Sequence, residues 1–293
     1  METVKKAAQK EVHTVISEKI IEHLQKGIVP WRTSWMEAGV PTSLISKRPF
    51  RGINVLLLAA LGYERNLFLT LKQLETAGGS LKPNEEPHTI VFWANQQPDA
   101  TSEASSDKKP GKLKTYMVYD IAQCTGIPED LIPEHILEAD PIKACEKIVG
   151  NLSNGPAMRY KEPGAFYDPL EDNINMPKLK SFANPACYYS ALFHQLAHST
   201  GHHTRLNRMG LVQMSEHGCD CHTLEELVTE IVTNYIENYA GIPYPFEPTE
   251  EYISGWIQKF KGDHYLIFTA CTLAQRAIDF ILNIKDVKDD AAQ

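Results

Sequence analysis

The chain has 293 residues, of which 43% are hydrophobic and 23% are charged, and its formal net charge is −8. These proportions are ordinary for a globular protein and exclude a disordered chain, a collagen and a coiled coil, while the length predicts two domains of roughly 120 to 160 residues each. The charge is uneven, because residues 1–125 hold 16 basic and 13 acidic side chains whereas the remainder holds 13 basic and 24 acidic ones. A mildly basic first half can meet phosphate groups, and an acidic second half suits a cation or a protein partner.

The first half is predicted to combine helices with two strands. Apolar residues at steps of three and four predict an amphipathic helix over residues 12–24 that ends at Gly27. Further helices are expected at residues 53–61 and 70–74, and strands rich in β-branched and aromatic side chains at residues 90–93 and 115–119. The polar residues 96–112 predict a flexible hairpin tip between these strands.

The character of the chain changes near residues 126–140, where Pro128, Pro133 and Pro141 mark a domain boundary. Beyond it we expect short strands at 165–167 and 173–177, helices at 186–199 and 223–239, and two more helices within 252–284. The sequence therefore predicts an α+β protein with two domains. Residues 1–130 form an α+β domain, and residues 140–293 form a mostly helical domain with a small sheet.

The cysteines and the apolar segments indicate the cellular compartment of the protein. The N-terminal segment is charged, and the longest apolar run, residues 53–61, is too short to cross a bilayer, so we expect a cytoplasmic protein without a membrane partner. The six cysteines are scattered, which favours reduced thiols. Cys219, Cys221 and His222 lie close enough together to suggest a second metal site, but ligands this close rarely surround one ion without help from elsewhere.

Residues 194–198 read His-Gln-Leu-Ala-His. Two histidines four apart lie on one face of a helix, so His194 and His198 can bind a single Zn²⁺ while the residue after the first histidine faces the metal-bound water. That residue is Gln195, at the position where zinc proteases of this pattern have a glutamate as general base. Because an amide cannot accept a proton from water, peptide hydrolysis is predicted to be absent or greatly reduced.

A catalytic zinc site usually has three protein ligands, so a third residue is needed. The nearby candidates are Glu225, Glu226, Glu230, His202 and His203. Glu226 is favoured because an antiparallel helix can present it and Glu230, one turn on, is available to support it. We predict one Zn²⁺ per chain, bound by His194, His198 and Glu226. The alternative is that two of the 11 histidines fall four apart by chance.

Aromatic and basic side chains alternate through the first half. Aromatic rings stack unpaired bases for about 1 to 3 kcal/mol each while cations follow the backbone, and this combination favours single strands of any sequence. The candidate contacts are Trp31, Arg32, Trp35, Arg48, Arg51 and Lys72. The alternative is that most of the aromatic residues belong to a hydrophobic core.

Both halves resemble one family. In residues 15–126 the resemblance is carried by residues 27–31, Trp35, residues 50–54, residues 70–73 and residues 78–79, and in residues 140–284 by residues 193–202, 205–208, 225–230 and 252–256. In this order they resemble the N-terminal domain and the metallopeptidase-like domain of ArdC-type antirestriction proteins.

The resemblance implies single-stranded DNA binding by the first domain, a zincin fold in the second, and a role on plasmids or other mobile elements in protecting incoming DNA from restriction. It adds Asn54 to the candidate DNA contacts, and a host restriction enzyme or another protein as a candidate partner. By position the resemblance implies that His194, His198 and Glu226 are metal ligands, and it places Gln195 where the family has glutamate. The first domain also departs from the family, since residues 42–45 lack the asparagine expected after Pro41.

Three hypotheses follow. The first is a DNA-binding protein whose second domain holds a metal without hydrolysing peptides. The second is a working metallopeptidase that uses another base, Glu225 or Glu230, through a water. The third is a protein-interaction scaffold that binds no metal.

Overall fold

The computed structural model describes residues 2–94, 112–134, 139–208, 220–243 and 247–285. Among them no helix is both long and apolar enough to span a membrane. The predicted hairpin tip lies almost entirely outside these residues, and so do Cys219 and the side chains of Cys221 and His222. The four cysteines whose side chains are described, Cys124, Cys145, Cys187 and Cys271, are free thiols.

The N-terminal region contains a four-stranded sheet flanked by helices. Its helices are α1 (Glu2–Gln25), the 3-10 turn η1 (Pro30–Arg32), α2 (Ile53–Ala59) and α3 (Leu71–Thr76). The sheet has the order β1-β2-β5-β4, with β1 (Thr42–Ser43), β2 (Leu67–Leu69), β4 (His88–Ala94) and β5 (Lys112–Asp120). A separate pair joins β3 (Ser80–Leu81) to β6 (Cys124–Thr125), followed by the connector to the second domain.

The long elements of this region confirm the sequence predictions. The two predicted strands pair antiparallel, from His88 opposite Val118 to Ala94 opposite Lys112. Thr70 and Gln73 form a reciprocal capping box at the start of α3, which explains why a short helix begins there. The pattern did not predict β1 and β2, whose two or three residues are too few for a recognisable alternation.

The C-terminal region is mostly helical with a small sheet. Its helices are α4 (Pro141–Gly150), α5 (Pro185–Ser199), α7 (Asp220–Ala240), α8 (Glu250–Gly262) and α9 (Leu266–Ile281). The sheet has the order β7-β9-β8, formed by β7 (Ala157–Arg159), β8 (Phe166–Asp168) and β9 (Asn173–Asn175). Two of these three strands and four of these five helices were predicted from the sequence; β7 and α4 were not.

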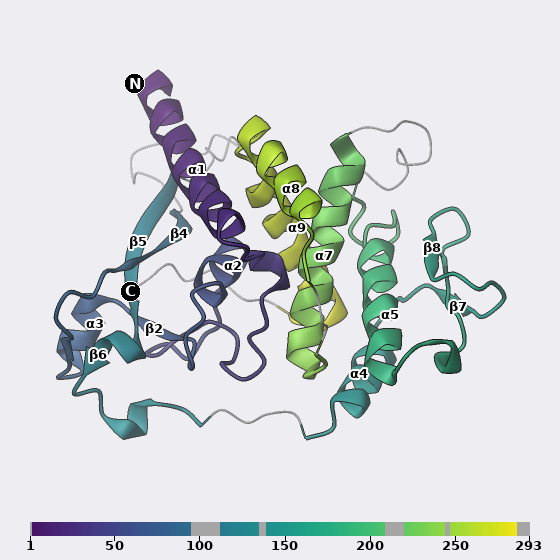
Figure 1. The fold of residues 1–293 in the computed structure, drawn as a ribbon, viewed down its shortest axis with the longest axis horizontal. Coiled ribbons are helices and arrows are strands. Elements are labelled where there is room, and N and C mark those ends of the chain that lie inside the picture. Colours follow the sequence, from purple (N-terminus) through teal and green to yellow (C-terminus); the bar gives the residue numbers. More distant parts are fainter. Residues whose placement is uncertain (1, 95–111, 135–138, 209–219, 244–246, 286–293) are drawn as a thin grey trace, which may run out of the picture.

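The two regions share one hydrophobic core. Figure 1 shows the sheet of the N-terminal region at one end, α1, α8 and α7 side by side in the middle, and α5 with the small sheet at the other end. One cluster of buried side chains contains Ile20 of α1 and Leu56 of α2 together with Phe193 of α5 and Val232 of α7. The N-terminal region has two smaller clusters of its own, centred on its sheet. The protein therefore has two domains, and the first buries part of its apolar surface against the second.

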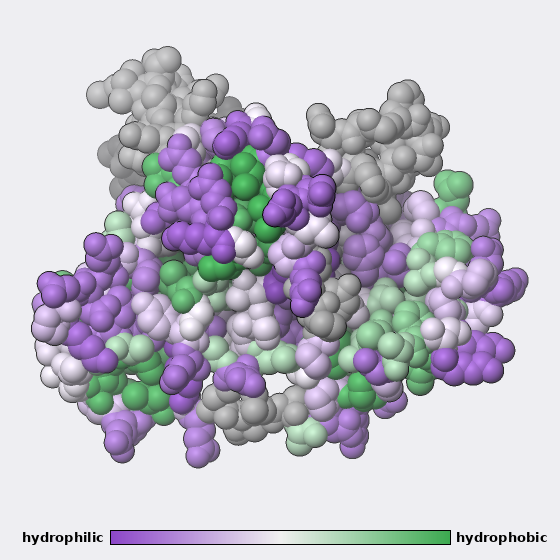
Figure 2. Space-filling view, in the orientation of Figure 1, coloured by the Kyte–Doolittle hydropathy of each residue, from purple (hydrophilic) through white to green (hydrophobic). Residues whose placement is uncertain are grey.

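The surface is largely polar on the face drawn in Figure 2, with hydrophobic area over α5 and the neighbouring small sheet. Large apolar side chains exposed in this part of the chain include Tyr160, Phe166 and Leu179. The helix α5 thus lies beside an exposed hydrophobic area.

Candidate metal centre

The helix α5 presents the two predicted histidines on its partly exposed side. The Asn184 side chain accepts a hydrogen bond from the backbone N–H of Cys187 at 2.9 Å, and Pro185 occupies the first turn, so the helix begins at a well-formed cap. Leu192, Phe193, Leu196 and Ala197 are buried, whereas His194, Gln195 and His198 retain partial exposure. Burial of one face therefore orients the other face, which carries the metal-binding pattern.

The helix α7 packs against α5 and brings Glu226, the predicted third ligand, to the histidines. The Nε2 atom of His194 lies 3.8 Å from one carboxylate oxygen of Glu226, and the Nε2 atom of His198 lies 3.6 Å from the other. One ligand atom from each of the three residues lies within 4.8 Å of the others, and no other such group occurs among the described residues. Two ligands about 2.0 to 2.1 Å from a tetrahedral ion are separated by about 3.3 Å. The three side chains therefore fit a metal ion with small adjustments, and the geometry agrees with the predicted ligand set.

The protonation of His194 also suits a ligand. Burial, and then the charge of the neighbouring His198, lower the pKa of His194 to about 4. The ring is therefore neutral at pH 7, with a lone pair available for a metal. The rings of the two histidines are 4.9 Å apart and nearly perpendicular, so both can point a nitrogen at one ion.

A buried carboxylate orients His198 from behind. The Oε1 atom of Glu225 lies 3.4 Å from the Nδ1 atom of His198, which must donate because the carboxylate has no proton to give. Arg208 bonds the same carboxylate through Nε at 2.9 Å and through a terminal nitrogen at 2.6 Å. Although burial alone would raise it, the hydrogen bonds from His198 and Arg208 hold the pKa of Glu225 below its usual range. A carboxylate on the second nitrogen of a ligating histidine fixes its tautomer and raises its basicity.

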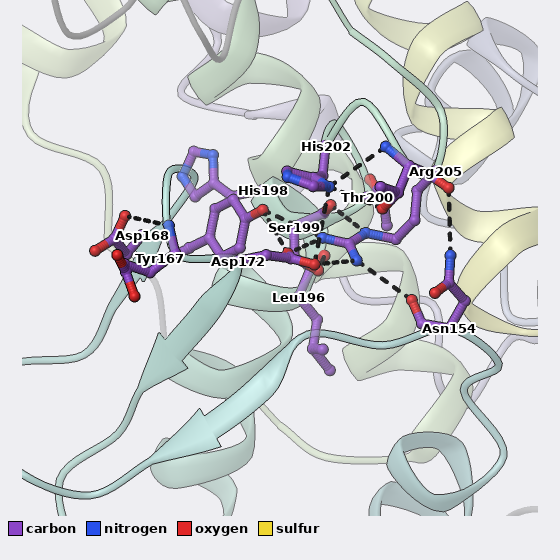
Figure 3. Close-up of polar contacts among 12 residues, drawn as sticks. Asn154, Tyr167, Asp168, Asp172, Leu196, His198, Ser199, Thr200, His202 and Arg205 are labelled. Carbon is purple, nitrogen blue, oxygen red and sulfur yellow. Dashed lines mark hydrogen bonds and ion pairs between the residues drawn. The ribbon is translucent and has the colours of Figure 1, made fainter.

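A second polar network holds the C-terminal end of α5 against the small sheet (Figure 3). The guanidinium of Arg205 donates to the backbone oxygen of Ser199 at 2.7 Å and pairs with Asp172, which also accepts a hydrogen bond from the Tyr167 hydroxyl. The bonds from Arg205 hold the pKa of Asp172 below its usual range, with a smaller contribution from Tyr167. The turn after α5 is thereby tied to β8 and to the residues just before β9.

The other candidate ligands lie elsewhere. His202 follows the end of the helix, where its Nδ1 atom is 2.8 Å from the Thr204 hydroxyl, and His203 is exposed with its ring beside that of His202. Glu230 does not support Glu226 in the way that the sequence predicted. Its carboxylate accepts hydrogen bonds from the Trp31 indole and the Tyr252 hydroxyl. The supporting carboxylate is Glu225, which the sequence does not distinguish from its acidic neighbours because its partner Arg208 meets it only in the folded chain.

Three of the predicted DNA contacts lie in the interior. Trp31 has no exposed surface, and Trp35 and Asn54 are 6% and 3% exposed. The Asn54 side chain bonds both backbone groups of Val91, at 2.8 and 2.9 Å. In this arrangement a base cannot stack on either indole or reach the amide. Their prediction as DNA contacts is corrected, because Asn54 bonds α2 to β4 and the two tryptophans pack against helices of the C-terminal region.

The four predicted cationic contacts divide into two kinds. Arg51 is paired with Asp279 of α9, and Arg32 lies 3.6 Å from Glu230 of α7, so both are engaged at the junction of the two regions. Arg48 and Lys72 are exposed. These two remain predicted contacts with nucleic acid.

Comparison with known proteins extends over both regions. Residues 10–123 match the N-terminal domain of the anti-restriction factor ArdC, and residues 144–273 match a zincin-like metallopeptidase domain. The structure is also similar to the Mn(II)-bound crystal structure of the antirestriction protein ArdC from plasmid R388. The TM-score is 0.73 at 28% identity, and the match covers 92% of this chain and 97% of that one. The chain belongs to the ArdC-type antirestriction proteins.

Other similar proteins include one that is much longer than this chain and others of similar length. This chain is 27% identical to the DNA primase TraC of Escherichia coli. The match covers 97% of this chain but only 28% of the primase. It is 26% identical to protein y4eC of Sinorhizobium fredii, covering 92% of this chain and 91% of that one. The metal-free crystal structure of ArdC from R388 matches with the same TM-score of 0.73. The zincin-like domain and the Mn(II)-bound relative support a metal site in this ArdC-type chain.

Proposed function

We propose that this ArdC-type protein binds single-stranded DNA, and that its zincin-like domain holds one Zn²⁺ on His194, His198 and Glu226 while hydrolysing peptides weakly or not at all. In this role it protects incoming DNA of a mobile element from restriction, with a host restriction enzyme or another protein as a candidate partner. The observation that carries the metal assignment is the convergence of the two histidines with Glu226, supported by Glu225 and Arg208 behind His198.

A bound Zn²⁺ would polarise a carbonyl group and make a water ligand more acidic. In zinc proteases of this pattern the residue after the first histidine removes a proton from that water. Here this residue is Gln195, which follows His194 on the partly exposed side of α5. Its amide can hydrogen-bond a water but cannot take its proton. We therefore infer that the site binds its ion and orients a ligand without efficient general-base catalysis.

The two carboxylates considered as substitute bases are already engaged. Glu225 is 3% exposed, and its oxygens are bonded to His198 and Arg208. Glu230 accepts hydrogen bonds from Trp31 and Tyr252. Donors on a carboxylate stabilise its charged form and weaken it as a base. These contacts favour loss of the base over its replacement.

The test compares the full chain with Gln195→Glu, both saturated with Zn²⁺ and freed of unbound metal. We expect about one zinc per chain by elemental analysis in both proteins, and a gain in cleavage of an unfolded protein substrate of about two to four orders of magnitude in Gln195→Glu. A matched control, His194→Ala combined with Gln195→Glu, should lose both the metal and the gain. No zinc in either protein would support the metal-free scaffold, and equal cleavage would support another base.

For the nucleic acid, the exposed cations Arg48 and Lys72 of the N-terminal region support contacts with phosphates rather than with bases. Because that region shares its core with α5 and α7, DNA binding should be measured on the full chain. We expect the affinity for oligo(dT) to fall steeply as salt rises. Binding that is undetectable or insensitive to salt would contradict this part of the proposal.

A further inference from the structure

The helix α7 is held by the N-terminal region at the turn next to Glu226, the proposed third ligand. Glu230 lies four residues after Glu226 on this helix, so the two carboxylates are one turn apart on the same side. One oxygen of Glu230 accepts a hydrogen bond from the Trp31 indole at 2.9 Å and another from the Tyr252 hydroxyl of α8. The same oxygen lies 3.6 Å from the Nε atom of Arg32. One carboxylate therefore joins η1, α7 and α8.

Trp31 is rigidly held for this role. It has no exposed surface, and its ring packs edge-on against Trp256 at 5.5 Å and Phe260 at 5.7 Å, both on α8. Because its neighbours fix the ring, the indole N–H points to a set place, where the Glu230 carboxylate lies at 2.9 Å and the Tyr252 hydroxyl at 3.0 Å. A buried indole that donates to a carboxylate also makes a hydrogen bond stronger than one between neutral groups.

The same segment of chain holds α7 again two turns later. The backbone N–H of Trp35 donates to the Asn238 side chain at 2.6 Å, and the Trp35 ring packs edge-on against Tyr235 at 5.2 Å. Residues 31–35 thus contact α7 at Glu230 and at Asn238. These contacts fix both the rotation of α7 about its axis and its position along that axis.

The rotation of α7 matters for the metal because Glu226 is the one ligand that does not come from α5. Metal–ligand distances are acceptable only within about 0.2 Å, so a small rotation of α7 changes how well the carboxylate reaches an ion shared with His194 and His198. Removing a donor from Glu230 would allow such a rotation without unfolding the helix.

We propose that Trp31 is a positioning residue for the metal ligand Glu226. Through Glu230 it sets the orientation of α7, so that the metal site is complete only while the N-terminal region is docked on the helical region. The inference rests on the proposed metal site. It assigns to Trp31 a role in the metal centre in place of stacking on DNA bases.

The experiment measures the dissociation constants of Mn²⁺ and Zn²⁺ for the full chain, by electron paramagnetic resonance of free Mn²⁺ and by competition with a chromophoric chelator. Trp31→Phe keeps an aromatic ring against Trp256 and Phe260 but removes the donor to Glu230, and Tyr252→Phe removes the other donor. Trp35→Phe is the matched control, since it makes the same change on the same segment, keeps both the backbone N–H that donates to Asn238 and an aromatic ring beside Tyr235, and leaves Glu230 bonded. The unfolding temperature of each metal-free protein is recorded as well.

We expect Trp31→Phe and Tyr252→Phe each to weaken metal binding about three- to tenfold, below the 10- to 100-fold typical of groups bonded directly to a ligand. The double variant should be weaker than either, and Trp35→Phe should stay within about twofold of the wild type even if its unfolding temperature falls. Equal metal affinity in all variants, or equal weakening in Trp31→Phe and Trp35→Phe, would overturn the inference. If the wild-type chain binds neither ion, the proposed metal site itself is refuted, and the inference falls with it.

Discussion

Contacting residues were predicted for both the metal centre and the N-terminal region, but the two sets lie differently in the structure. On the helical side, His194, His198 and Glu226 converge as their positions in the sequence predicted. On the N-terminal side, Trp31 and Asn54 are turned inward, although their residue types suit contact with DNA. The difference teaches that spacing on a helix predicts which side chains share a face, whereas composition does not predict whether that face meets solvent.

The shared core explains the second outcome. Trp31 belongs to the same buried cluster as Phe193 of α5 and Trp256 of α8. An aromatic residue that follows a helix can end in its own domain, at a domain interface or on the surface, and each gives the same sequence. Only the packing of the two regions decides between these positions.

The strongest test of this comparison removes the tertiary support of the metal site and leaves its helical spacing intact. Glu225→Gln should weaken metal binding about 10- to 100-fold, because His198 loses the charged acceptor that fixes its ring. Binding is measured by chelator competition on the full chain. The control Asp172→Asn also removes a carboxylate paired with an arginine near the end of α5, but it touches no metal ligand. If both variants bind metal as tightly as the wild type, local spacing alone would suffice.

A second test asks whether the two regions unfold as one unit. Glu237 of α7 and Asp120 of the N-terminal sheet are almost fully buried, and burial raises the pKa of each to about 7. Between the unfolded values near 4.5 and 3.8 and the folded values, the folded state binds more protons, so the free energy of unfolding falls as pH rises through this window. Each group should contribute a loss on the order of 3 to 4 kcal/mol by pH 8.

The substitution Glu237→Gln removes a carboxyl group that cannot ionise without cost, so its stability relative to the wild type should increase from pH 5 to pH 8. Urea unfolding with a chelator present measures this, and Asp120→Asn should show the same trend in the same single transition. A pH dependence unchanged by Glu237→Gln would refute the assignment to Glu237. Two separate transitions would show that the shared core does not couple the regions.

The smallest expected effect concerns the exposed cations. Replacing both Arg48 and Lys72 by alanine should weaken oligo(dT) binding of the full chain about three- to tenfold at low salt and reduce the salt dependence, because up to two phosphate contacts are lost. Replacement of the exposed Glu75 by alanine on the same helix as Lys72 serves as a control for surface changes. Unchanged affinity and salt dependence would show that Arg48 and Lys72 do not contact the DNA.

Much of the fold follows from local patterns. Residues 12–24, 186–199 and 223–239 have the helical period over many turns, and each forms the predicted helix. The short strands β1, β2, β3, β6 and β7 were missed, since a few residues carry little periodic signal and each strand depends on a partner elsewhere in the chain. The helix α4 was missed although Asp140 caps it and Pro141 begins it, because the prolines of this segment were assigned to a domain boundary. The role of Arg208 was missed for a related reason. An arginine in a loop is ordinary until the fold places Glu225 beside it.

The sequence by itself determined the pair of histidines on one helix face, the acidic helix able to supply a third ligand, and the amide at position 195. These are properties of neighbouring residues, and helical geometry converts their spacing directly into distance. Tertiary structure alone decided that Glu225 supports His198, that Glu230 is bonded to Trp31, and that the predicted aromatic contacts lie inside. Those outcomes depend on which surfaces of two regions are buried against each other, and burial is a property of the packed chain as a whole.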